Sequence, residues 1–149
     1  MAVRVSASGT AVGPPVEVAA GARPDVAYAR GEFLAVWEQP AETLVPGVIR
    51  AQRVSAAGVL VDAAFDVSQR GIMGDASVGP SVAGDVSGWI VARRESGNSY
   101  ASSGAARMVG RLLPYANPTA SGPEVPLDEA RAGFFGLPAL AAGTRGQSE

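Results

Sequence analysis

The chain of 149 residues contains no cysteine and no histidine, and its twelve basic residues are all arginine. These absences rule out disulfides, thiolate and imidazole metal sites, cysteine nucleophiles and Ser-His-Asp triads. Carboxylates could still bind calcium, but Asp66 and Asp75 in "DVSQRGIMGD" do not have the ligand spacing of an EF-hand. The sequence also lacks a glycine-rich phosphate-binding motif. We therefore predict no cofactor, no metal site and no catalytic residue.

Positive charge and long apolar runs are also scarce. The net charge is −2, so no broad basic surface is available for a nucleic-acid backbone. No run approaches the roughly 18 apolar residues that span a bilayer, and "MAVRVSASG" at the amino terminus has no apolar core of a signal peptide. Nucleic acid and membrane are therefore not expected as partners, and no signal peptide is visible.

Glycine and proline, in contrast, are abundant, with 19 and 11 residues. This content favours many turns over long helices, and the best helical segment, "LDEARAGF" at 127–134, is short. The run "FLAVW" at 33–37 is apolar throughout and too short for an isolated helix, which is typical of a strand buried on both faces. These patterns predict a single all-β domain.

Three markers recur along the chain. The first, "RVSASGTAV" at 4–12, returns as "RVSAAGVLV" at 53–61, with a degraded third copy beginning at Arg111. The second is a proline followed by an apolar step, at Pro24, Pro80 and Pro138. The third, "GEFLAVWE" at 31–38, returns as "GWIVARRE" at 88–95, with Glu38 and Glu95 in equivalent places. The common order of the markers predicts a repeat of about 50 to 58 residues.

Each repeat holds about four short strands, the size and strand count of a β-propeller blade. The predicted fold is a partial or oligomer-completed β-propeller of four-stranded antiparallel blades. Gly9 and Gly58 are predicted in the hairpin turn of the first marker, where glycine supplies a positive φ. We divide the single domain into a half blade (1–21), a blade (22–77), a second blade (78–135) and the start of a further blade (136–149). A β-sandwich is the alternative, since it shares the strand lengths and the density of turns.

The stretch "PDVAYARGEFLAVWE…VIRAQRVSAAGVLV" resembles the tandem repeats of many bacterial secreted and cell-surface proteins. Those repeats carry a Pro-x-Val-Ala step, a Tyr-Leu-Val-Val-Trp-like strand and an Arg-Val-x-x-x-Gly hairpin. The resemblance implies a propeller fold and a secreted or surface location, with no catalytic residue to transfer. Together with the internal repeat, it gives as structural repeat positions Pro24, Trp37, Arg53, Gly58, Pro80 and Pro138.

Two departures from the repeat have consequences. In the second unit Arg93-Arg94 replace Val36-Trp37, which argues against burial of that strand on both faces. The chain also holds only about two and a half blades, whereas closed propellers usually have at least four. An open stack exposes apolar surface and strand edges, so we expect association with a second copy or with the rest of a longer chain.

The first functional hypothesis is a non-catalytic structural or interaction module that presents loops to a protein or glycan. Trp89, Tyr100 and Tyr115 lie near predicted loops and are candidates for binding, whereas Phe33 and Trp37 are assigned to the core. One alternative is a fragment of a propeller hydrolase, which would gather two or more of its acidic residues in a pocket. Candidates for that role are Glu38, Glu95, Glu124, Asp128 and Glu129. The other alternative is a self-assembling β-structure.

Overall fold

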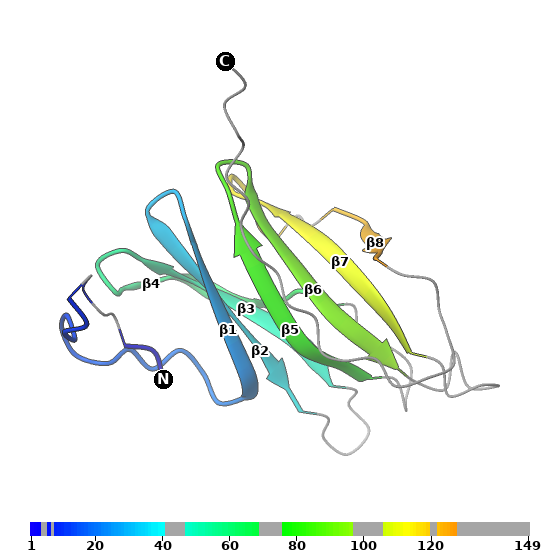
Figure 1. The fold of residues 1–149 in the computed structure, drawn as a ribbon, viewed down its shortest axis with the longest axis horizontal. Helices are drawn as coiled ribbons and strands as arrows, with labels where there is room; N and C mark the ends of the chain where they lie inside the picture. The colour runs from blue at the N-terminus through cyan, green and yellow to red at the C-terminus, as the bar shows by residue number, and fades with distance from the viewer. Residues whose placement is uncertain are drawn as a thin grey trace.

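The structure is a computed structural model that describes residues 1–3, 6, 8–40, 47–68, 76–96, 106–119 and 122–127. These residues form two four-stranded antiparallel sheets, each built from four strands in chain order (Figure 1). Sheet one contains β1 (Ala22–Ala29), β2 (Glu32–Gln39), β3 (Val48–Ser55) and β4 (Leu60–Asp66). Sheet two contains β5 (Ala76–Gly84), β6 (Gly88–Ser96), β7 (Ala106–Pro114) and β8 (Glu124–Pro126). The predicted all-β class and four-stranded antiparallel sheets are confirmed, and the two sheets do not close on themselves.

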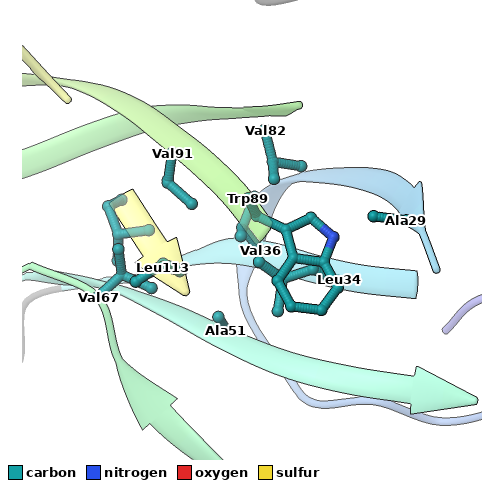
Figure 2. Packing of buried hydrophobic residues seen from close by; sticks show 10 residues of the cluster. Ala29, Leu34, Val36, Ala51, Val67, Val82, Trp89, Val91 and Leu113 are labelled. Carbon is teal, nitrogen blue, oxygen red and sulfur yellow. The ribbon is translucent and has the colours of Figure 1, made fainter. Parts of the chain in front are cut away.

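The sheets stack face to face, with β5 lying across β1, β2 and β3. We call the face of each sheet that meets the other sheet its inner face, and the opposite face its outer face. Leu34, Val36 and Ala51 of sheet one pack against Trp89 and Val91 of sheet two (Figure 2). Burying an aliphatic or aromatic side chain of this size contributes about 1.5–3 kcal/mol, so this interface is the main hydrophobic core.

Trp89 lies at the centre of this core. Its indole ring sits beside Ala29 of sheet one, and a Cβ placed on Gly84 would lie 2.8 Å from the ring and 2.9 Å from the Ala29 methyl group. Because Gly84 has no side chain and Ala29 has only a methyl group, they leave a slot that the indole ring of Trp89 fills. Placing a large side chain against small neighbours in this way lets a protein core reach the packing density of an organic crystal.

Two hydrogen bonds cross from β1 and β2 to β5. The Asp25 carboxylate accepts one from the Val82 amide at 2.8 Å, and the Glu38 carboxylate accepts one from the Gly79 amide at 3.3 Å. A buried amide without a hydrogen-bond partner costs free energy. The two carboxylates therefore supply partners to the amides of β5 and also set the position of β5 on sheet one.

The proline marker coincides with a β-bulge. The register of β1 shifts between Ala22 and Asp25, around Pro24, and that of β5 shifts between Val78 and Ser81, around Pro80. Proline has no amide proton for the ladder, and bulges are one of the few places in a sheet that accept it. The proline marker therefore corresponds to a β-bulge in the first strand of each sheet. Because it lies within that strand, the predicted boundary between 77 and 78 falls inside β5.

The opening repeat of the sequence is a repeat of structure. Ser6 and Ser55 begin identical turns, in which the serine amide donates to Thr10 or Val59 and the serine carbonyl accepts from Gly9 or Gly58. The predicted positive φ is present at both glycines, at 82° and 83°. The pairing of Ala2 with Val16 also matches that of Ala51 with Phe65, 49 residues later in both strands.

The strand pairing corrects one alignment. In sheet one Val26 pairs with Ala35, and in sheet two Val82 pairs with Val91, so both strands of this hairpin repeat at 56 residues. The sequence alignment of "GEFLAVWE" with "GWIVARRE" used 57 and was wrong by one residue, since it maximised identity without knowing the register. Trp89 therefore occupies the place of Phe33, and Arg93 that of Trp37.

Gly84→Ala tests the slot around Trp89. We expect it to lower the free energy of unfolding by about 1–3 kcal/mol, because the new methyl group overlaps the indole ring and Ala29. Urea unfolding followed by circular dichroism measures the change. Gly122→Ala is the control, since its Cβ meets only the Leu112 carbonyl at 3.9 Å. Equal stability of both variants would contradict the packing described here.

Candidate functional site

The structure brings together two of the three predicted binding aromatics. The rings of Trp89 and Tyr115 stack at 5.3 Å between centroids, and the Arg30 guanidinium lies 4.8 Å above the Tyr115 ring. Trp89 is only 1% exposed, however, so the expectation that it is an exposed binding residue was wrong. Its nearness to a predicted loop suggested exposure, but the stack of sheets covers it. Tyr100 lies outside the described residues.

Three further repeat positions lie in sheet one or in its β3–β4 turn. Trp37 is buried, as predicted, and Gly58 lies in its turn. Arg53 pairs with the carboxylates of Glu32 and Asp62, which tie β3 to β2 and β4. Pro138 lies outside the described residues.

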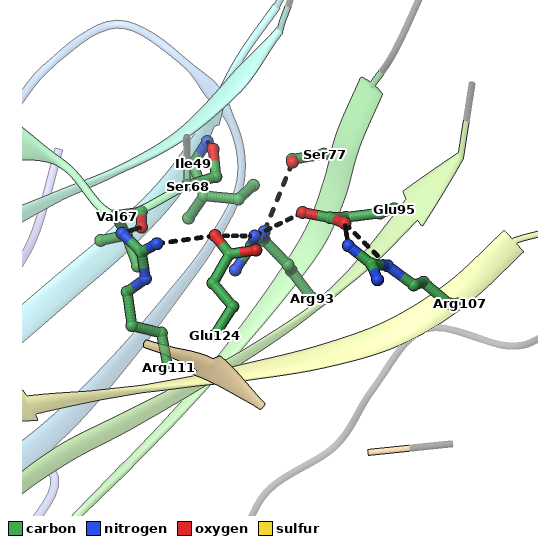
Figure 3. Close-up of polar contacts among 9 residues, drawn as sticks. All are labelled: Ile49, Val67, Ser68, Ser77, Arg93, Glu95, Arg107, Arg111 and Glu124. Carbon is green, nitrogen blue, oxygen red and sulfur yellow. Dashed lines mark hydrogen bonds and ion pairs between the residues drawn. The ribbon is translucent and has the colours of Figure 1, made fainter. Parts of the chain in front are cut away.

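A group of charged side chains occupies the inner face of sheet two beyond Val91 (Figure 3). We call it the arginine–glutamate cluster; it comprises Arg93, Glu95, Arg107, Arg111 and Glu124. Arg93 lies at its centre, with its side chain 0% exposed, and bonds to both glutamates. Arginine at position 93 therefore does not keep the inner side of this strand from being buried. Ile90 and Arg94 on its outer side are only partly buried, in line with the expectation that the strand is not buried on both faces. Carboxylates from β6 and β8 compensate the buried charge.

The cluster also reaches sheet one. Arg111 donates from one guanidinium nitrogen to the Val67 carbonyl at 2.6 Å and from the other to Glu124 at 2.8 Å. Burial lowers the pKa of the Arg111 guanidinium, and Arg93 lowers it further, while Glu124 and Glu95 raise it. The arginine nevertheless remains charged, as guanidinium groups do in proteins. The residue that follows β4, Val67, is thus bound to β7 through the Arg111 guanidinium within the interface.

The cluster partly meets the condition set for a hydrolase, since Glu95 and Glu124 both contact one arginine. Each glutamate, however, pairs with a second arginine, Arg107 or Arg111. A general acid must reach a substrate, and a carboxylate held between two guanidinium groups is poorly placed to do so. Glu38 lies apart from the cluster, paired with Arg23 at 2.8 Å. The arrangement therefore favours a structural role.

An apolar groove lies on the outer face of sheet one. Val26 and Tyr28 are 57% and 56% exposed there, and the rings of Tyr28 and Phe33 are 4.9 Å apart. The groove has a volume of about 580 Å³ and runs between this face and the N-terminal residues. We call it the outer groove; its lining comprises Ala2, Val3, Val12, Val16, Val26, Tyr28, Phe33, Ala35, Val54, Ala56 and Gly58. Exposed apolar surface of this kind marks sites where other molecules bind.

Sequence reasoning missed the outer groove. Phe33 was assigned to the core with Trp37, but it is only half buried. Val26 and Tyr28 are two residues apart in β1, so their side chains share one face of the strand. This spacing is a signal that could have pointed to an apolar face. Which face the second sheet covers is decided only by the stacking.

Comparisons with family models, curated proteins and solved structures gave no match to this chain. Among the described residues, no helix is long and apolar enough to cross a membrane. Within the same part of the chain, no group of three or more acidic side chains is placed to hold a metal ion.

Arg93→Ala tests the arginine–glutamate cluster. We expect a loss of about 1.5–3 kcal/mol in the free energy of unfolding, because each glutamate loses its bond to Arg93 and keeps only the one to Arg107 or Arg111. Arg23→Ala is the matched control, since Arg23 is exposed and makes one ion pair, worth less than about 1 kcal/mol. Urea unfolding of both variants measures the difference. A loss no greater for Arg93→Ala than for Arg23→Ala would rule out a central role for Arg93.

Proposed function

We propose that this chain is a non-catalytic structural and interaction module of the β-propeller type, in which four-stranded sheets serve as successive blades of a scaffold. The observation that carries the proposal is which face of each sheet makes the contact between the sheets. Sheet one meets sheet two through Leu34 and Val36, whereas sheet two meets sheet one through Trp89 and Val91, the equivalents of Phe33 and Ala35.

The two sheets therefore meet through opposite faces of the equivalent hairpin, and not through equivalent faces. In a β-sandwich, each sheet has one apolar face turned to the core and one polar face turned to water. A stack in which every sheet uses one face for the sheet before it and the other for the sheet after it needs two apolar faces. The apolar outer face of sheet one, with Val26, Tyr28 and Phe33, is what such a stack requires.

The chemistry of the outer groove favours a polypeptide as the partner. Sugars are bound through hydrogen bonds to polar side chains together with flat exposed aromatic rings, whereas apolar docking surfaces suit side chains of another polypeptide. The groove lining is aliphatic and aromatic, and it includes no charged residue. A scaffold that holds a protein partner against this face accounts for the groove better than a glycan site does.

An assay of glycoside hydrolysis separates this proposal from the hydrolase alternative. We expect the purified chain to release no chromophore from a panel of nitrophenyl glycosides, because Glu95 and Glu124 are held by arginines. Glu124→Gln should lower the urea midpoint, whereas Glu17→Gln, at an exposed site outside the cluster, should not. Turnover by the unmodified chain that is lost in folded Glu124→Gln and retained in Glu17→Gln would overturn the proposal.

A further inference from the structure

The N-terminal residues repeat the second half of sheet one. Residues 1–18 contain the turn at Ser6 and the pairing of Ala2 with Val16, both with the geometry found 49 residues later. By this offset Ala2, Val16 and Val18 correspond to Ala51, Phe65 and Val67. We call the described residues of this stretch (1–3, 6 and 8–18) the N-terminal hairpin; their pairing and turn are equivalent to those of β3 and β4.

The N-terminal hairpin also occupies the equivalent position. Ala51, Phe65 and Val67 lie on the inner face of sheet one and pack with the core formed against sheet two. Their counterparts Ala2 and Val16 line the outer groove, opposite the outer face of sheet one. Val18 lies across a second cavity, of about 330 Å³, from Trp37. The hairpin therefore stands against sheet one as β3 and β4 stand against sheet two.

The outer face of sheet one in turn corresponds to the inner face of sheet two. Val26 matches Val82, Phe33 matches Trp89 and Ala35 matches Val91. Strand pairing extends the match to the third strand, since Val54 pairs with Phe33 as Leu113 pairs with Trp89. Both surfaces needed for another copy of the sheet–sheet interface are thus present around the outer groove.

One part of the interface has no counterpart. In the core, Ala29, Leu34 and Val36 of the β1–β2 hairpin pack against sheet two and complete the surface begun by β3 and β4. Among the described residues, no strand pairs with the edge of the N-terminal hairpin that corresponds to the β2-facing edge of β3. The outer groove lies where side chains equivalent to Ala29, Leu34 and Val36 would pack.

We propose that the outer groove binds a β-hairpin of the β1–β2 type from a second polypeptide that carries this repeat. The incoming hairpin pairs with the free edge at residues 1–3 and completes a four-stranded sheet with the N-terminal hairpin. It places its equivalents of Ala29, Leu34 and Val36 against Val26, Phe33 and Ala35. Backbone pairing supplies affinity, and the alternate side chains supply specificity. The inference rests on the proposed function, because it assumes that the stack of sheets continues.

Binding of a synthetic hairpin to the full chain tests the proposal. The probe is a fluorescein-labelled peptide of residues 22–40, "ARPDVAYARGEFLAVWEQP", followed by fluorescence anisotropy. A two-stranded hairpin is at best marginally stable alone, so the groove must order the peptide as it binds. We expect saturable binding with one peptide per chain.

Matched variants identify the face that binds. In the peptide, Leu34→Asp should weaken binding by at least about tenfold, since a charge enters the groove, whereas Phe33→Asp, on the opposite face of the hairpin, should not. In the protein, Val26→Asp should weaken binding similarly. Leu112→Asp, which is equally exposed at 57% but lies outside the groove, should leave binding unchanged. Circular dichroism and urea unfolding establish that both protein variants are folded.

Three results would overturn the proposal. The first is a folded chain that does not bind the peptide, and the second is equal weakening by Leu34→Asp and Phe33→Asp. The third is a dimer in light scattering that Val26→Asp dissociates and the peptide does not, which would make a whole second copy the occupant. None of these results would show that the chain hydrolyses glycosides. Failure of the peptide-binding proposal therefore leaves the proposed function intact. Hydrolysis dependent on Glu124 would overturn the proposed function without affecting peptide binding.

Discussion

The contact between the two sheets is the interaction on which the rest of the structure depends. Trp89 fills a slot that is open only because Ala29 and Gly84 are small, and the apolar residues around it belong to both sheets. Neither four-stranded sheet alone buries its inner face. The same contact determines that sheet two presents the counterparts of Phe33 and Ala35, and so determines which face of sheet one remains open.

One interface combines two kinds of chemistry. Near the β5–β6 turn it is apolar, around Trp89, and farther along β6 it becomes ionic, around Arg93. An arginine buried at the position of Trp37 needs carboxylates that come from elsewhere in the chain, and β8 supplies one of them in Glu124. Although β8 is a short edge strand, its Glu124 is a counterion of Arg93 on β6, two strands away in the sheet. Ionic contacts of this kind restrict which partner a sheet can accept, since a wrong partner leaves charge uncompensated.

The strands, the hairpin turns and the repeat were predictable from the sequence, because each follows from local chemistry. Gly9 and Gly58 are needed where φ is positive, and Pro24 and Pro80 are accepted at bulges. The candidate site was much less predictable. Glu95 and Glu124 meet only through Arg93, across a separation in sequence that no spacing rule covers. The one-residue error in aligning Phe33 with Trp89 had the same origin, since register depends on the partner strand.

The sequence by itself determined an all-β chain, the positions of its turns and the approximate repeat. These properties depend on backbone preferences and on apolar alternation within a few residues. Only the tertiary structure decided that Trp89 is buried and Tyr28 is exposed, although both are aromatic residues of the first two strands of their sheets. Sheets with two apolar faces can stack on either one, and the sequence of one strand does not say which. That choice is made when Trp89 enters the slot between the sheets, which leaves the outer groove on the opposite face of sheet one.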